Sequence, residues 1–177
     1  VLGAFNMPKA YTFFYKKTIF LKKREKMNNY VVVLGSNLPS EFGNSDETLK
    51  KCVNDIRSYR AIKSVVESKW YSSLSFLDER EPRYVNVGIE LNTNLKPVEL
   101  LNFTSGLENK YGRKRQRRWD SRTCDIDILD YRGFVYKLYI NNNKLLIPHP
   151  RLHSRNFVLF PLFEIEKNWN HPIKKTN

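Results

Sequence analysis

The chain has 177 residues, 41% hydrophobic and 14% aromatic, which is typical of one modest folded domain. Its formal net charge of +13 points first to nucleic acid or an anionic membrane surface as a partner. No apolar run approaches the roughly 20 residues that cross a bilayer, and two cysteines are too few for a disulfide scaffold or a zinc ribbon.

The positive charge is concentrated in two short segments. Residues 1–26 carry seven basic side chains against one acidic side chain, and residues 112–122 carry six against one. The rest of the chain is therefore nearly neutral. Residues 1–26 show no clean structural period and lack the uninterrupted apolar centre of a secretory signal. We expect them to be a basic extension, with organelle targeting as the alternative, and residues 27–177 to form a single domain.

The domain begins with a strand and a helix. The β-branched run Tyr30–Leu34 ends at a Gly-Ser-Asn turn, which predicts a buried strand. Asn44, followed three residues later by Glu47, is typical of a helix N-terminus. The apolar residues that follow fall on one helical face: Leu49, Cys52, Val53 and Ile56.

Two strands and a second helix are expected next. Residues 62–71 resemble a strand, and residues 72–83 form a polar loop. Residues 85–91 then alternate between apolar and polar, so one face lies in the core and Asn86 points to the other face. Pro97 suits the first position of an amphipathic helix that ends at Gly112.

The last elements complete a recognisable order. Residues 123–131 predict another strand, residues 141–143 a turn, and the apolar segment Phe157–Ile165 is expected to pack on the body. The order strand, helix, strand, strand, helix, strand predicts an α+β fold of the split βαβ (ferredoxin-like) type. In that fold an antiparallel sheet carries helices on its back face.

The segment Arg122–Asp130 carries acidic residues two positions apart in a predicted strand. Because alternate strand residues point the same way, Asp125 and Asp127 are expected to present two carboxylates on one face. Mg²⁺ typically takes one or two carboxylates together with substrate phosphates. The alternative is a solvated strand face with two unremarkable acids, which an Asp-x-Asp pattern alone does not exclude.

The basic loop just upstream favours the metal interpretation. Arginine binds phosphate through two parallel hydrogen bonds, and Mg²⁺ between carboxylates and phosphates is the usual apparatus of phosphoryl transfer. On its own the arginine run would be more typical of a solvated or nucleic-acid-binding patch. Together, the loop and the paired carboxylates indicate a site for a nucleoside triphosphate.

Several further motifs occur in order between about Tyr30 and Ile165. They are Leu34–Asn37, Tyr84–Asn86, Gly112–Arg115, Arg118-Trp119, Arg122–Ile128, Ile147–Arg151 and Arg155–Leu162. This combination closely resembles the 6-hydroxymethyl-7,8-dihydropterin pyrophosphokinase family. The resemblance implies an enzyme that transfers pyrophosphate from ATP to the hydroxymethyl group of that pterin, releasing AMP, in folate biosynthesis. It also implies ATP as co-substrate, two Mg²⁺ ions and a cytoplasmic location. No nucleic acid or membrane is expected as a partner, and other folate-pathway enzymes are candidate partners.

The resemblance also assigns roles to individual positions. Asp125 and Asp127 match the metal ligands, and they count as catalytic together with Arg113 and Arg122, which match phosphate-binding arginines. The positions that match ATP contacts are Glu108, Arg115, Arg118, Ile128, Lys144, His149 and Arg155. Those that match the pterin pocket are Ser73, Phe76, Tyr84, Asn86, Trp119 and Phe157. The chain departs from the family pattern at Ser105, often Gln in bacterial relatives, and at Asp120-Ser121, usually Gly-Pro.

Two alternatives stay open at this point. An antiparallel sheet with this order of elements is also the architecture of RNA-recognition modules, and the net charge suits nucleic acid. Such modules stack bases on exposed aromatic side chains of the sheet face, where Asp125 and Asp127 are expected here. The other alternative is an inactive relative of the enzyme family.

Overall fold

The computed structural model describes residues 27–75, 80–113, 121–140 and 143–174. The expected basic extension and most of the basic loop lie outside these residues. None of the helices in the described part of the chain is long and apolar enough to span a membrane.

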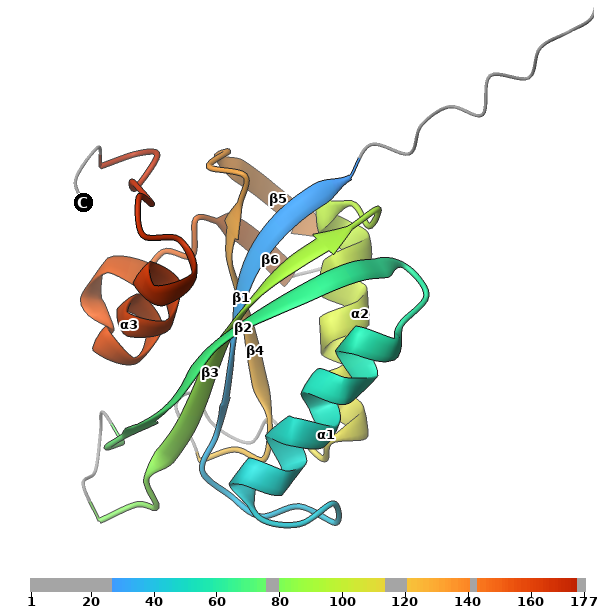
Figure 1. Ribbon diagram of the computed structural model, residues 1–177, viewed down its shortest axis with the longest axis vertical. Coiled ribbons are helices and arrows are strands. Elements are labelled where there is room, and N and C mark those ends of the chain that lie inside the picture. The colour runs from blue at the N-terminus through green and yellow to red at the C-terminus, as the bar shows by residue number, and fades with distance from the viewer. Residues whose placement is uncertain (1–26, 76–79, 114–120, 141–142, 175–177) are drawn as a thin grey trace, which may run out of the picture.

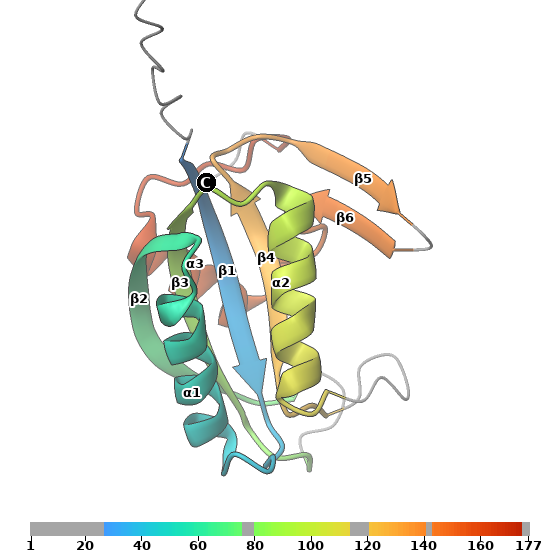
Figure 2. The ribbon, with the colours of Figure 1, turned by 90° about the vertical axis from the view of Figure 1, so that its right-hand side faces the viewer.

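One four-stranded antiparallel sheet forms the centre of the molecule. Its strands are β1 (Asn28–Ser36), β2 (Ile62–Ser73), β3 (Tyr84–Thr93) and β4 (Asp125–Tyr131). They lie in the order β2-β3-β1-β4. Helices α1 (Ser45–Ser58) and α2 (Pro97–Lys110) cover one face together, to the right of the sheet in Figure 1 and in front of it in Figure 2. The predicted split βαβ fold is confirmed.

Local signals explain where both helices begin. In α1 the Asn44 side chain accepts a hydrogen bond from the Glu47 N–H at 2.9 Å, and the Glu47 carboxylate accepts one from the Asn44 N–H at 2.9 Å. This reciprocal pair satisfies two N–H groups that the helix leaves without partners. Helix α2 starts at Pro97 as predicted, and it ends at Lys110, two residues before Gly112, whose φ is +80°.

Strand β1 is buried on both faces. Tyr30, Val32 and Leu34 belong to the core beneath α1 and α2. Val31 and Val33 belong to a second core with residues of helix α3 (Asn156–Ile165). Figure 2 shows α3 on the far side of the sheet from α1 and α2. The expectation that residues 157–165 pack on the body is therefore met by a helix on the opposite face.

A small hairpin and two corrected strand limits complete the fold. Strands β5 (Tyr136–Ile140) and β6 (Asn143–Ile147) pair only with each other among the described strands. The predicted turn at 141–143 falls largely on residues outside the described ranges. The predicted strand 62–71 continues to residue 73, because β2 keeps its pairing with β3 up to Ser73 opposite Tyr84. The strand predicted at 123–131 begins only at Asp125, where its pairing with β1 starts.

Helix α3 approaches β3 closely at Gly88. A Cβ atom on Gly88 would lie 2.7 Å from Pro161 Cβ and 3.2 Å from Ile165 Cδ1. The Gly88 N–H donates to Ser68 Oγ at 2.9 Å, which fixes this point of the strand. Glycine at this position therefore sets how closely α3 can lie on the sheet.

We expect Gly88→Ala to destabilise the protein by about 1–3 kcal/mol, because the added methyl group must push α3 away from a packed contact. Chemical denaturation measures the change in the free energy of unfolding. Gly106→Ala is the matched control: apart from the backbone of α2 itself and the residues next to Gly106, no atom lies within 4 Å of the new Cβ on that exposed position. Alanine favours a helix over glycine by about 0.5–1 kcal/mol. Equal effects of the two substitutions would contradict the prediction.

Candidate active site

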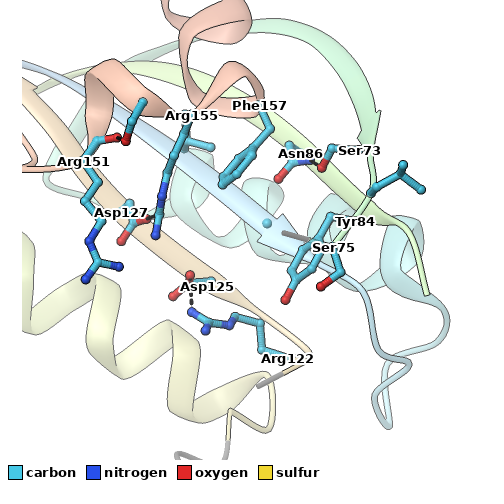
Figure 3. A pocket seen from close by; sticks show the side chains of 14 residues that line it. Ser73, Ser75, Tyr84, Asn86, Arg122, Asp125, Asp127, Arg151, Arg155 and Phe157 are labelled. Carbon is cyan, nitrogen blue, oxygen red and sulfur yellow. Dashed lines mark hydrogen bonds and ion pairs between the residues drawn. The ribbon is translucent and has the colours of Figure 1, made fainter. Parts of the chain in front are cut away.

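A cavity of about 180 Å³ opens on the α3 face of the sheet, where β1 ends and β3 and β4 begin. Its lining comes from these three strands, from the end of β2 and the residues after it, and from α3 with the turn before it (Figure 3). We call it the first cavity. It is lined by Val33, Gly35, Ser73, Leu74, Ser75, Tyr84, Asn86, Arg122, Asp125, Asp127, Arg151, Ser154, Arg155 and Phe157.

Strand register explains why these side chains meet. Gly35 of β1 lies opposite Asp125 on one side and opposite Asn86 on the other. Paired residues share a face, and side chains alternate between faces along each strand. Asp125 and Asp127 of β4 and Tyr84 and Asn86 of β3 therefore all point toward α3. A Cβ atom on Gly35 would lie 3.1 Å from Asn86 Oδ1. The absence of a side chain there leaves the floor of the cavity open.

One end of the first cavity is aromatic. Phe157 projects into it from α3 and Tyr84 from β3, as Figure 3 shows. Asn86 lines the same cavity; it is buried and donates from Nδ2 to Ser73 Oγ at 3.0 Å. Two rings with an amide nearby can bind a flat heteroaromatic ring by stacking and by hydrogen bonds to its edge.

The other end is charged. Asp125 receives Arg113 Nη2 at 2.7 Å and Arg122 Nη1 at 2.5 Å. Asp127 lies 3.6 Å from Arg155 Nη1 and 3.9 Å from His149 Nε2. Guanidinium groups therefore lie next to both carboxylates, and groups of this kind also bind phosphate.

Arg113 has a second carboxylate partner, the Glu108 side chain of α2. Glu108 also accepts a hydrogen bond from the Ile126 N–H at 2.8 Å. Burial raises the pKa of Glu108, and the charge of Asp125 adds to this effect, while Arg113 opposes it. Glu108 thus holds both Arg113 and the start of β4 next to the paired carboxylates.

Burial also shifts the pKa values of two residues of the site, Asp127 and His149. It raises the pKa of Asp127 to about 7, helped by the charge of Asp125 and opposed by Arg155. It lowers the pKa of His149 to about 4, and the charge of Arg155 acts in the same direction. His149 is therefore neutral at pH 7 and can both donate and accept a hydrogen bond.

This shift predicts a pH dependence of stability. Between about pH 4 and 6.5 the unfolded chain protonates His149 and the folded protein does not, so stability is lost as the pH falls through this range. One such proton contributes up to about 1.4 kcal/mol per pH unit. Asp127, whose pKa is raised to about 7, acts in the opposite direction over the same range. We therefore expect His149→Gln to gain stability relative to the wild type as the pH falls from 7 to 4, measured by urea unfolding. His153→Gln, at an exposed position, is the control; a constant difference between His149→Gln and the wild type across this range would contradict the prediction.

The carboxylates fit Mg²⁺ bound together with a substrate. Asp125 and Asp127 share one strand face, and both are only partly exposed, with 19% and 29% of the side chain accessible. Among the described residues, no group of three or more His, Cys, Asp or Glu side chains is arranged to hold a metal ion. Mg²⁺ needs no such cage, since phosphates and water complete its coordination.

A second, wider cavity of about 480 Å³ adjoins the first. Its lining comes from α2, β4, β6 and the turn after β6: Leu101, Thr104, Ser105, Glu108, Arg113, Ile126, Asp127, Ile128, Lys144, Leu145, Leu146, His149, Pro150 and Arg151. Asp127 and Arg151 line both cavities. A carboxylate and a guanidinium therefore stand where the two cavities meet.

Every site residue predicted from the sequence and described by the structure lines one of these cavities. Eight line the first: Ser73, Tyr84, Asn86, Arg122, Asp125, Asp127, Arg155 and Phe157. The second takes Glu108, Arg113, Ile128, Lys144 and His149, with Asp127 again. Arg155, predicted as an ATP contact, lies in the first cavity beside Asp127. Four predicted residues lie outside the described ranges: Phe76, Arg115, Arg118 and Trp119. The individual roles stay predictions.

The sequence-based prediction did not include Arg151. It belongs to the motif Ile147–Arg151 that contributes to the family resemblance, but the resemblance assigned it no role. Ser75 and Ser154, which also line the first cavity, carried no signal at all.

An aromatic cavity that shares a carboxylate with a wider polar one can hold two ligands side by side, an arrangement that suits a two-substrate transferase. The chain belongs to the 7,8-dihydro-6-hydroxymethylpterin-pyrophosphokinase (HPPK) family, whose family model matches residues 31–167. It is a pyrophosphokinase that acts on a reduced pterin.

Relatives from several organisms support this family assignment. The chain is 38% identical over 134 residues to the 2-amino-4-hydroxy-6-hydroxymethyldihydropteridine pyrophosphokinase of Haemophilus influenzae, covering 76% of this chain and 79% of the relative. The enzyme of the same name from Bacillus subtilis is 36% identical over 140 residues, with 78% and 79% covered. The folic acid synthesis protein FOL1 of Dictyostelium discoideum is 34% identical over 153 residues, which cover 82% of this chain and 21% of that protein.

A solved structure supports the fold. The crystal structure of a Plasmodium falciparum HPPK-DHPS triple mutant matches with a TM-score of 0.57 at 13% identity. The match covers 84% of this chain and 42% of that chain. The present chain thus corresponds to less than half of that longer protein.

Proposed function

We propose that this protein transfers the terminal pyrophosphoryl group of ATP to the hydroxymethyl group of 6-hydroxymethyl-7,8-dihydropterin and releases AMP, as a step of folate biosynthesis. The observation that carries the proposal is the pair of adjoining cavities with Asp127 and Arg151 in common. One cavity suits a flat ring and the other is larger and polar. The shared residues mark where the two substrates would meet.

The pterin is proposed to occupy the first cavity. Its ring would stack between Phe157 and Tyr84, while Asn86 and Ser73 bond to its edge. Asn86 is well placed for this role because its own bond to Ser73 holds the amide in one orientation. A ring fixed there directs its hydroxymethyl group toward Asp125 and Asp127, at the charged end of the same cavity.

ATP is proposed to occupy the second cavity, with its phosphates toward Asp127. In the transfer, the hydroxymethyl oxygen forms a bond to the β-phosphorus. The bond from that phosphorus to the oxygen bridging to the α-phosphorus breaks, and AMP leaves with the electron pair. The hydroxyl proton is released. Arg113 and Arg122, which pair with Asp125 here, would exchange part of that pairing for phosphate oxygens and hold the transferred group for attack.

Asp125 and Asp127 would hold two Mg²⁺ ions together with phosphate oxygens. When bound, the metal neutralises charge around the transferred phosphorus. Neutral His149, adjacent to Asp127, would donate from Nε2 to a polar atom of the nucleotide without adding charge, because its Nδ1 accepts from the Arg151 N–H. The location in the cytoplasm, the limits of the domain and contacts with other folate-pathway enzymes stay predictions.

An assay of product identity tests the proposal. Purified protein with ATP, Mg²⁺ and 6-hydroxymethyl-7,8-dihydropterin should form AMP and the pterin diphosphate in equal amounts, separated by ion-exchange chromatography. Excess EDTA should stop the reaction, and excess Mg²⁺ should restore it. Formation of ADP alone, or no turnover by well-folded protein, would refute the proposal.

The RNA-binding alternative loses support from the fold. The sheet face that such a module uses to stack bases is covered here by α3 and carries Asp125 and Asp127 (Figure 1). Tight RNA binding with a steep salt dependence, unaffected by Mg²⁺-ATP and pterin, would favour it again.

A further inference from the structure

Arg151 lies at the junction of the two cavities. It is half-buried, lines both cavities, and shares this position only with Asp127 among the residues of the two linings. Figure 3 shows its side chain extending past Asp127, on the side away from Phe157 and Asn86. A cationic group there faces the region in which the proposed substrates would be joined.

The main chain holds Arg151 in place. Its N–H donates to His149 Nδ1 at 3.3 Å, and its carbonyl oxygen accepts from Ser154 Oγ at 3.1 Å. Residues 152–154 form a single 3-10 turn directly after it. The side chain therefore starts from a fixed backbone point beside the junction of the two cavities.

Arg151 is one of four described arginines in the two linings. Arg113 and Arg122 lie against Asp125, and Arg155 lies against Asp127. Of these four, Arg151 alone lines both cavities. A guanidinium at that place can contact phosphate oxygens on either side of the junction.

We propose that Arg151 binds the transferred diphosphate group, making contact with it both in ATP and in the pterin diphosphate product. This inference rests on the proposed function, because it names the part of the nucleotide that Arg151 recognises. Arginine suits the task, since its planar group can bond two oxygens of one phosphate at once. A contact kept across the transfer would stabilise the charge that develops on the phosphoryl oxygens.

Binding without turnover provides the first test. The probe is ATP with a methylene group in place of the oxygen between the α- and β-phosphorus atoms, because that bond then cannot be cleaved. With Mg²⁺, Arg151→Ala should weaken binding of this probe by about 10-fold or more, whereas AMP binding should change less than about twofold. Isothermal titration calorimetry measures both. Equal weakening of probe and AMP would overturn the inference.

Turnover provides the second test. We expect Arg151→Ala to lower kcat by about 100-fold, and Arg151→Lys to recover part of it, because lysine keeps the charge and loses the paired geometry. Arg60→Ala is the matched control: Arg60 is exposed at the opposite end of β2 from Ser73 and should leave kcat unchanged. A kcat within about threefold of wild type in Arg151→Ala would overturn the inference.

The two levels of failure are distinguishable. If the wild-type protein releases no AMP, the proposed reaction fails, and probe binding alone decides whether Arg151 recognises the diphosphate. If the wild type is active and Arg151→Ala equals it, only the role of Arg151 fails. The thermal midpoint of Arg151→Lys guards against misfolding: a normal midpoint together with weakened probe binding supports the inference.

Discussion

Replacing Asp127 with Asn is expected to lower kcat by at least about 100-fold while the free energy of unfolding stays equal or rises. Asp127 lies in both cavities, and in the proposed reaction its charge binds Mg²⁺ beside the phosphates, so activity should be lost with that charge. The stability is kept because Asp127 holds its negative charge in a buried position, where the charged form of a carboxyl group is unfavourable. Its pKa is raised to about 7 by burial and by Asp125.

The sign of the stability effect follows from that pKa. A carboxyl group whose folded-state pKa is raised binds its proton more tightly in the folded protein than in the unfolded chain. Above pH 7 the folded state must hold the unfavourable charged form, and Asn has no charge to hold. The gain from Asp127→Asn should therefore be largest at pH 8 and vanish toward pH 4. Urea unfolding in EDTA at both pH values measures it.

Asp125→Asn provides a contrast on the same strand. It should abolish activity as well, but it also removes the carboxylate that pairs with Arg113 and Arg122, both mostly buried. Leaving two guanidinium groups without that partner should destabilise the fold by about 1–3 kcal/mol. Asp46→Asn, on the exposed surface of α1, is the control for both variants. Wild-type AMP release by Asp127→Asn would exclude the metal role.

The faces of the strands could be predicted from the sequence because alternation is a local property. It placed Asn86 off the core beneath α1 and α2, and it put Asp125 and Asp127 on one face; the structure agrees for all three. The start of α1 was equally local, since Asn44 and Glu47 form their reciprocal bonds within four residues.

The position of α3 could not be predicted in the same way. Its sequence is apolar on nearly every side, so periodicity does not select a face. The information lies partly in β1, whose continuous apolar run requires cover on both faces, and partly in Gly88, where the helix meets the sheet. Both clues identify α3 only after the sheet has been assembled.

Arg151 escaped prediction for a related reason. It lies between a strand and a helix, in a turn interrupted by prolines, where no structural period predicts a side-chain direction. Only the packing of this turn against β4 brings it to Asp127; the His149 N–H donates to the Leu129 carbonyl at 3.0 Å and thereby holds the segment there. The resemblance to a family helped at positions with assigned roles and gave none for this one.

Phe157→Ala is expected to weaken pterin binding by about 10- to 100-fold, since stacking of an aromatic side chain on a heterocyclic base contributes about 1–3 kcal/mol. Phe157 projects into the first cavity opposite Tyr84, and the Arg155 guanidinium lies 5.5 Å from its ring centre. Removing the ring therefore opens one wall of the cavity and leaves the charged end in place. At saturating pterin, kcat should fall much less than affinity.

Fluorescence titration of the pterin, with the uncleavable ATP analogue and Mg²⁺ present, measures this affinity directly. Phe157→Tyr should retain most of it, because a phenol ring still stacks. Phe160→Ala is the matched control on the same helix; that ring is 61% exposed and stacks on Tyr71, outside the cavity. An unchanged dissociation constant in Phe157→Ala would show that the pterin does not lie against α3. A fall in kcat without a fall in affinity would instead assign Phe157 to alignment of the reacting groups.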